Sequence, residues 1–273
     1  MNSAPLSILV GNPDPEAEVR EPDRDRLLAT VAHELRTPLM PIISGALVLQ
    51  RRGIDPELAQ ATARIIERQA RLLGRLVDDL LEVSRAKLGT VELQRRRVSM
   101  AAIVESCVQT MAPYISDRGQ RLQVTISPDS MELHADATRL CQALQNLIVN
   151  SAKFSDRGAV IRVHAARDER DAVVVVDDDG VGIDPAHLDS IFTLFTQVGA
   201  GPAHALGGGL GIGLYLARRF VEAHGGTLIA TSGGAGTGSR FTIRLPCPDS
   251  VPEAAGAPQR DPSSRSVSDL TTA

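Results

Sequence analysis

Two consecutive segments with helical apolar periodicity limit the folds open to this chain more than any other feature. In residues 23–50, apolar side chains recur at steps of three and four, at Leu28, Val31, Leu35, Leu39, Ile42, Ala46 and Leu49. This spacing predicts an amphipathic helix, because residues three and four apart share one face. A second helix is predicted from Pro56 to about Lys87, with Asp55 as its N-cap.

The apolar residues of the second segment repeat about every 3.5 positions, which is the repeat of a coiled-coil seam. They are Leu58, Ala61, Ile65, Leu72, Leu76, Leu80 and Val83. A two-helix hairpin by itself cannot bury two such faces, whereas two hairpins can form a four-helix bundle. We therefore expect a homodimer built on residues 23–88, within a first domain that spans residues 23–90.

After Gly89 the pattern changes to short strands mixed with helices. Strands are expected near residues 91–98, 121–127, 131–137, 160–166, 172–178, 226–232 and 239–246, and helices from residue 99, over 137–152 and over 210–224. This order predicts a two-layer α/β sandwich over residues 91–246, with helices on one face. The fold class is therefore α+β, with a dimerising antiparallel helical hairpin followed by the sandwich. The polar leader, residues 1–22, and the tail, residues 247–273, are expected to be disordered.

Composition argues against several classes of partner. The net charge is −4, aromatic residues make up 3% and tryptophan is absent, so neither a basic surface nor a stacking platform for nucleic acid is expected. The three cysteines are odd in number and widely spaced, which fits a reducing compartment and no metal site. The apolar run at residues 6–10 is too short for a signal peptide or a membrane span. We therefore expect a cytoplasmic protein.

The segment NLIVNSAKFS, residues 146–155, places Asn146 and Asn150 on one helix face with Lys153 close by. An amide oxygen is a hard ligand that suits Mg²⁺, an ion that takes few protein ligands and several phosphate oxygens. A lysine one turn further on can neutralise phosphate charge. The alternative interpretation is a polar helix face without a ligand.

The segment DDDGVGI, residues 177–183, follows four consecutive valines, so a buried strand ends in carboxylates and glycines. Asp178 can accept a hydrogen bond from an adenine amino group, and Gly180 and Gly182 allow the backbone to approach the base closely. The alternatives are an acidic turn or a cation site.

Further glycines punctuate the C-terminal half. Gly209, Gly211 and Gly213 open a predicted helix, whose N-terminal amides suit a triphosphate. Their spacing does not match a dinucleotide-binding fingerprint. The segment GTGSRF, residues 236–241, is a further glycine turn before a strand.

The order of the motifs is more specific than any one of them. HELRTPL, NLIVNSAKFS, DDDGVGI, IFTLF, GLGIGL and GTGSRF closely resemble the H, N, G1, F, G2 and G3 boxes of sensor histidine kinases, over about residues 25–246. The resemblance implies a dimerisation and phosphotransfer domain followed by a gyrase-like ATP-binding domain. It also implies ATP and Mg²⁺ as cofactors, Asn150 as the metal ligand, and Phe195 and Thr237 as members of the nucleotide site.

The same resemblance gives roles to the segment AHELRTPL, residues 32–39. A neutral imidazole near pH 7 is a competent nucleophile, and His33 is the expected phosphoacceptor. By resemblance, Glu34 hydrogen-bonds the other ring nitrogen and acts as the base. Thr37 lies one turn from His33 and corresponds to a residue that positions water for dephosphorylation of the regulator. Pro38 deletes a helix hydrogen bond and permits a bend.

We therefore expect an ATP-dependent protein histidine kinase that phosphorylates itself on His33. It then passes the phosphoryl group to an aspartate in the receiver domain of a response regulator, and it is also expected to dephosphorylate that regulator. A separate sensor protein is a candidate partner. The alternatives are a degenerate kinase that serves as a phosphotransfer or binding scaffold, and a gyrase-like ATPase, which has no need of His33.

The expected lid over the nucleotide, residues 193–207, contains no lysine or arginine, and His204 is its only ionisable side chain. We expect modest affinity for the triphosphate, which improves as His204 becomes protonated below roughly pH 6.5.

Overall fold

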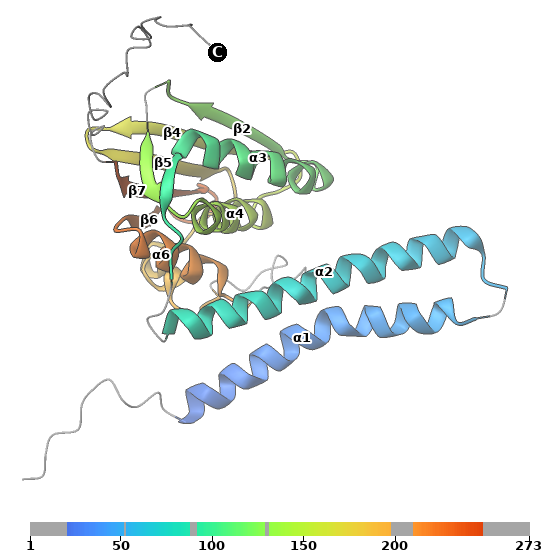
Figure 1. Ribbon diagram of the computed structural model, residues 1–273. Helices are drawn as coiled ribbons and strands as arrows, with labels where there is room; N and C mark the ends of the chain where they lie inside the picture. The colour runs from blue at the N-terminus through green and yellow to red at the C-terminus, as the bar shows by residue number, and fades with distance from the viewer. Residues whose placement is uncertain (1–20, 52, 88–91, 129–130, 198–209, 248–273) are drawn as a thin grey trace, which may run out of the picture.

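A computed structural model describes residues 21–51, 53–87, 92–128, 131–197 and 210–247, with the side chains of residues 21–28, 86 and 87 left undescribed. Most of the leader and tail that were expected to be disordered, residues 1–20 and 248–273, lie outside the described residues. Two parts are visible in Figure 1, a long helical hairpin and a sheet covered by helices. The predicted α+β class is therefore confirmed.

The hairpin consists of α1, Glu21–Leu49, and α2, Pro56–Lys87. Helix α2 begins at the predicted proline, because the Asp55 carboxylate accepts a hydrogen bond from the Leu58 amide at 3.0 Å and so caps the first turn. The two helices approach closely at Gly45, where an added Cβ would lie 2.9 Å from a side-chain carbon of Ile66.

Helix α1 continues through Pro38 and Pro41 and changes direction midway along its length (Figure 1). A proline inside a helix lacks an N–H donor and crowds the preceding turn, which accounts for the predicted bend. None of the described helices is long and apolar enough to cross a membrane.

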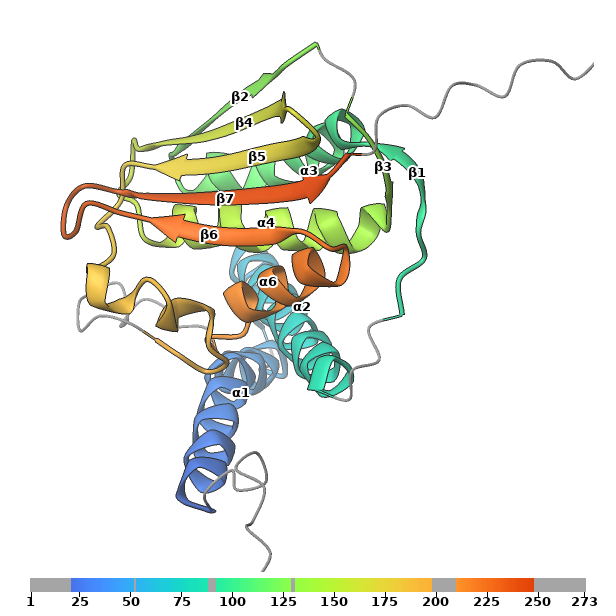
Figure 2. The same cartoon turned by 90° about the vertical axis from the view of Figure 1, so that its left-hand side faces the viewer.

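The second part is a mixed five-stranded sheet in the order β2-β4-β5-β7-β6, plus a two-stranded ladder of β1 and β3. The strands are β1 Arg96–Ser99, β2 Arg121–Ile126, β3 Glu132–Ala135, β4 Val160–Asp168, β5 Asp171–Asp178, β6 Thr227–Thr231 and β7 Ser239–Pro246. The helices are α3 Met100–Asp117, α4 Ala137–Lys153 and α6 Gly213–Ala223, with short 3₁₀ turns at Pro185–His187 and Ser190–Phe192. The helices lie on one face of the sheet (Figure 2), so the predicted two-layer sandwich is confirmed.

Two predicted boundaries are wrong. The strand expected from residue 91 begins at Arg96, where pairing with β3 starts. The helix expected from residue 210 begins at Gly213, because Gly211 has a φ of +68° and cannot continue a right-handed helix.

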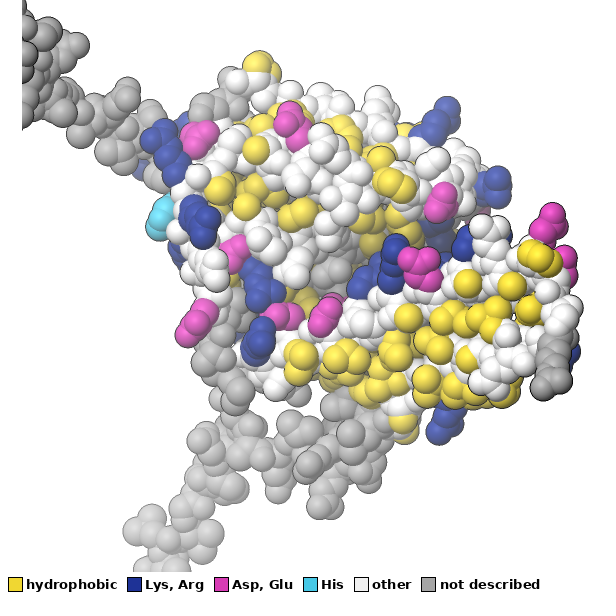
Figure 3. All heavy atoms as spheres, turned by 45° about the vertical axis from the view of Figure 1, so that its right-hand side comes forward, with side chains coloured by type: hydrophobic (Ala, Val, Ile, Leu, Met, Phe, Trp, Pro, Cys, Tyr) yellow, Lys and Arg dark blue, Asp and Glu magenta, His cyan; other side chains and the backbone are white. Residues whose placement is uncertain are grey.

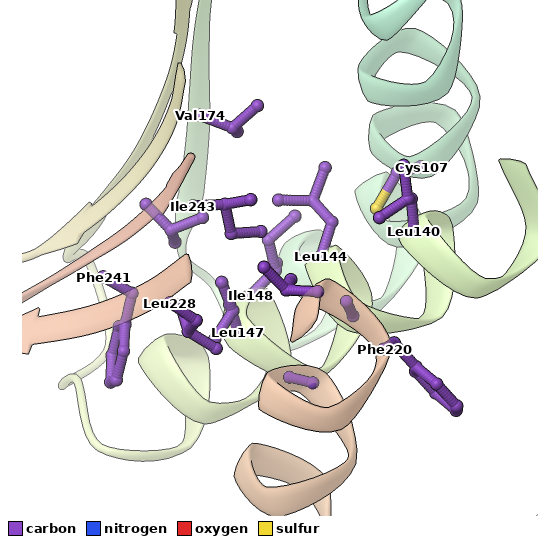
Figure 4. Packing of buried hydrophobic residues seen from close by; sticks show 14 of the residues in the cluster. Cys107, Leu140, Leu144, Leu147, Ile148, Val174, Phe220, Leu228, Phe241 and Ile243 are labelled. Carbon is purple, nitrogen blue, oxygen red and sulfur yellow. The ribbon is translucent and has the colours of Figure 1, made fainter. Parts of the chain in front are cut away.

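The core lies between the sheet and α3, α4 and α6 (Figure 4). Alternation along β5 follows from strand geometry, since Ala172, Val174 and Val176 are fully buried while the two intervening valines are only half-buried. Helix α4 presents its apolar stripe to this layer, with Leu144, Leu147 and Ile148 among the most buried side chains. Asp136 accepts hydrogen bonds from the amides of residues 138 and 139 and so fixes the start of α4.

Candidate functional site

Asp178 is the last residue of β5, and its carboxylate is buried with 4% of its surface exposed. Oδ1 accepts hydrogen bonds from the backbone amides of Gly180, at 2.9 Å, and Ser239, at 3.2 Å. Oδ2 accepts from the hydroxyls of Ser151, at 2.8 Å, and Ser239, at 2.7 Å. A buried carboxylate is stable only when its oxygens are satisfied in this way. These four donors thus fix the orientation of Asp178 at the edge of the sheet.

The neighbouring aspartates have different partners. Asp177 pairs with Arg240 at 3.2 Å, and Asp179 pairs with Arg162 at 2.8 Å. The Arg162 guanidinium, through its hydrogen bonds, lowers the pKa of Asp179. Of the three consecutive aspartates, Asp178 is therefore the one held in the interior between sheet and helices.

Glycines allow the loops around Asp178 to pack against one another. A methyl group on Gly180 would collide with the carbonyl oxygen of Phe154, one on Gly182 with that of Gly234, and one on Gly238 with that of Asp178. From the sequence, Gly180 and Gly182 were expected to let the backbone approach a base. In the structure, the space that a Cβ would need at these positions is occupied by other parts of the protein backbone.

Helix α4 carries the predicted polar face. The Asn146 amide donates a hydrogen bond to the carbonyl of Gly213 at 3.0 Å, so it ties α4 to the first residue of α6. Asn150 lies one turn further on and is half-buried. The Lys153 ammonium lies 4.8 Å from the centre of the Phe154 ring. The polar face therefore has one residue used for packing and two that remain candidates for ligand contact.

The segment before α6 folds back on residues 195 and 196. The Phe195 amide donates to the carbonyl of Gly211 at 3.2 Å, and Phe195 itself has a φ of +64°. A Cβ on Gly211 would lie 2.6 Å from the carbonyl oxygen of Thr196. Phe195 and Gly211 are thus brought together, while Gly213 lies beside Asn146 of α4. Gly209, together with His204 and residues 198–207 of the expected lid, lies outside the described residues.

The turn before β7 is held by hydroxyl groups. Thr237 is exposed, and its hydroxyl donates to the carbonyl of Gly234 at 2.8 Å. The Ser232 hydroxyl donates to the carbonyl of Gly238 at 2.7 Å. Thr237 therefore shapes the turn that delivers Ser239 to Asp178.

The histidine-bearing turn of α1 lies close to the end of α4. His33 is exposed, and the Thr37 hydroxyl donates to the His33 carbonyl at 3.1 Å. Burial raises the pKa of Glu34, and the charges of His33 and Lys153 oppose this rise. Burial likewise lowers the pKa of Lys153, against the charge of Glu34. A carboxylate and an ammonium from different domains thus lie within electrostatic reach of each other.

Sequence reasoning missed Ser151 and Ser239, the two side chains that orient Asp178. Both lie inside the quoted motifs, but a serine in a motif gives no sign of its partner. The contact depends on the pairing of β5 with β7, in which Asp178 stands opposite Ser239.

Comparisons with known proteins agree with this geometry. Residues 23–89 match the His Kinase A (phospho-acceptor) domain, and residues 135–249 match the histidine kinase-, DNA gyrase B-, and HSP90-like ATPase family. The chain is 32% identical over 234 residues to the histidine protein kinase DivJ of Caulobacter vibrioides, covering 85% of this chain but 38% of that protein. The chain therefore spans well under half the length of this curated relative.

Two solved structures share the fold. Full-length ShkA in complex with AMPPNP has a TM-score of 0.60 at 26% identity and covers 81% of this chain and 45% of that one. The histidine kinase ThkA in complex with the response regulator protein TrrA has a TM-score of 0.59 at 22% identity, over 82% of this chain and 64% of that one.

We predict that Gly238→Ala lowers the free energy of unfolding by about 4 kcal/mol or more, the range of the most disruptive single changes. The added methyl group would collide with the Asp178 carbonyl oxygen and push apart the backbone around the Asp178 carboxylate. Gly236→Ala is the matched control, since Gly236 has a similar φ of +77° but open space around its Cβ. It should cost only about 1–2 kcal/mol of backbone strain. Urea unfolding measures both, and equal losses would contradict the packing role of Gly238.

Proposed function

The chain belongs to the sensor histidine kinases of two-component systems, and from this premise we propose that it is an ATP-dependent kinase that phosphorylates its own His33. The observation that carries the proposal is the position of the histidine-bearing turn of α1, whose Glu34 lies within electrostatic reach of Lys153 of α4. A phosphoacceptor and a phosphate-neutralising lysine then belong to one site. Neither a binding scaffold nor a gyrase-like ATPase requires this juxtaposition.

The proposed nucleotide contacts follow from the site geometry. Asp178 is held in the interior by four donors and is the proposed acceptor for the adenine amino group. Lys153 and the amides at the start of α6 are the proposed partners of the phosphates. Gly180, Gly182, Gly211 and Gly213 shape the loops around them, and Asn146 holds α6 in place.

The donor set of the site fits a Mg²⁺ ion that is held mainly by the phosphates of bound ATP. Among the described residues, no group of three His, Cys, Asp or Glu side chains could hold a metal ion. Asn150 offers one amide oxygen, which suits an octahedral ion that takes its other ligands from phosphates and water. When bound, the ion would neutralise charge that develops on the transferred phosphoryl group.

The protein's own groups complete the reaction. An unprotonated imidazole nitrogen of His33 attacks the γ-phosphorus, a P–N bond forms, and the P–O bond to the β-phosphate breaks to release ADP. The proton on the other ring nitrogen passes to Glu34, whose raised pKa makes it a stronger base. We propose that the phosphoryl group then moves to an aspartate of a response regulator, the class of partner with which the fold neighbour ThkA was solved.

A homodimer is the proposed assembly. Apolar side chains remain exposed along the hairpin and form a continuous stripe on its outer face (Figure 3). They are Leu39, Met40, Ile43, Leu47, Leu49, Leu58, Ile65, Leu72, Val77 and Leu81. A second hairpin laid on this stripe would bury it in a four-helix bundle.

The assembly predicts a mass of two chains in solution, because the stripe is too large to leave in water. Light scattering at micromolar concentration measures the mass. A value equal to one chain would rule out the dimer. Replacing Ile65 and Leu72 with glutamate should shift the mass toward one chain, whereas glutamate at the exposed polar positions 60 and 68 should not.

The kinase proposal predicts that His33→Gln abolishes labelling by γ-labelled ATP while ATP still binds. Asp178→Asn should instead weaken ATP binding itself, by about 1–3 kcal/mol, through loss of a charged hydrogen bond. Acid and alkali treatment of the labelled protein identifies phosphohistidine, which is acid-labile and alkali-stable, and calorimetry measures binding. Label retained on His33→Gln would place the acceptor elsewhere. An ATPase would hydrolyse ATP equally well in both His33→Gln and the parent.

A regulator phosphatase activity is proposed for the same turn. The Thr37 hydroxyl lies one turn from His33 and reaches its carbonyl, so it is near the acceptor without being the nucleophile. Thr37→Ala should therefore keep autophosphorylation and lose dephosphorylation of the regulator. Thr37→Ser, which keeps the hydroxyl, should retain both. Equal phosphatase rates in the parent and Thr37→Ala would refute this role.

A further inference from the structure

The ATPase-like domain rests on the hairpin of its own chain through α2. Val83 is 5% exposed and belongs to the core of the domain. One residue earlier, Glu82 forms an ion pair with Arg139 of α4 at 3.0 Å, with 15% and 20% of the two side chains exposed. The Arg139 guanidinium also lies 5.2 Å from the centre of the Phe220 ring on α6. Loss of either partner from an ion pair this well covered would leave an uncompensated charge, which is more costly than at the surface.

The domain also reaches α1 of the same chain. Val31, two residues before His33, packs against the buried cluster that contains both Val83 of α2 and the core of the sheet domain. Glu34 and Lys153 each alter the other's pKa, which requires their charges to be close. Both helices of the hairpin lie on the α6 side of the sheet domain (Figures 1 and 2). The turn that carries His33 is therefore within electrostatic reach of Lys153 of its own chain.

The surface proposed for the dimer lies elsewhere on the hairpin. The exposed stripe that includes Leu39, Ile43, Ile65 and Leu72 remains free when the domain rests on α1 and α2 (Figure 3). A second hairpin can thus be added without removing the domain from its own α1. The partner's acceptor would then have to compete with a histidine that is already in place.

We propose that the phosphoryl group is transferred within one chain, from ATP held by the sheet domain to His33 of that same polypeptide. The inference rests on the kinase function proposed above. The bond changes are the same as in the kinase reaction described above. The P–N bond forms on His33 of the same subunit that bound the ATP and releases the ADP. Glu82 and Arg139 act as positioning residues, because their ion pair holds the domain against α2 of the hairpin that carries His33, and they touch no reacting atom.

Mixed dimers test this inference. Full-length chains with two different affinity tags are coexpressed and purified through both tags, and light scattering verifies two chains per particle. The first dimer combines His33→Gln with Asp178→Asn, and ATP is supplied well below the dissociation constant of the Asp178→Asn site, so that the intact histidine and the occupied nucleotide site are on different chains. The second combines the parent with the double variant that carries both changes. Repeating both dimers with Asn150→Ala in place of Asp178→Asn guards against misfolding of a buried-site variant.

Transfer within one chain predicts background labelling of the first dimer. The second dimer should be labelled as strongly, per intact histidine, as the parent. The opposite pattern, with label in the first dimer and none in the second, would overturn the inference and assign transfer to the partner. Labelling of both mixed dimers would also overturn the inference, because transfer within one chain would then not be the exclusive route. A parent homodimer that takes no label would instead reject the kinase function itself, so the two failures are distinguishable.

The positioning pair gives an independent readout. Glu82→Arg and Arg139→Glu should each slow labelling while leaving ATP affinity unchanged, and the combined charge reversal should restore the rate. Arg85→Glu is the matched control, since Arg85 contacts Glu82 at 3.1 Å from an exposed position on the same helix. Slowing without rescue in the double variant would contradict the role of the pair.

Discussion

The buried carboxylate of Asp178 is the interaction on which the arrangement of the site depends. Its four donors come from three separate stretches of chain: Ser151 on α4, Gly180 in the loop after β5, and Ser239 at the start of β7. Removing a carboxylate from water costs several kcal/mol unless its oxygens are satisfied, so each donor must be present together with the others. The glycine contacts follow from this requirement, because only residues without a Cβ allow the three stretches to come so close. The positions of the loops are therefore set by one charged group.

A second constraint joins the hairpin to the sheet domain. Val83 is buried in the domain's core, and Glu82 is paired with Arg139 beside it. Asp79, one turn earlier on α2, is itself partly buried, and this burial raises its pKa to about 6 against the opposing charge of Arg75.

Much of the secondary structure could be predicted from periodicity and local chemistry. Asp55 and Pro56 mark the start of α2, and the run of valines before Asp177 marks β5. The start of α6 could not be placed, because Gly211 takes a left-handed φ that depends on its contact with Thr196. Ser151 and Ser239 were missed for a related reason. A hydroxyl group has many possible partners, and only the register of β5 with β7 shows that theirs is Asp178.

The sequence by itself determined the kinds of element and the chemistry available: two amphipathic helices, a histidine followed by a glutamate, and six motifs in a diagnostic order. These are local properties, encoded by spacing and residue type over a few turns or one strand. The tertiary structure decided which of three consecutive aspartates is buried, which glycines are required by packing, and which face of the hairpin meets the sheet domain. Those outcomes depend on contacts between residues far apart in the chain, such as Glu82 with Arg139 and Asp178 with Ser239. No local pattern can specify them, because the free energy of each contact exists only once both partners have been brought together.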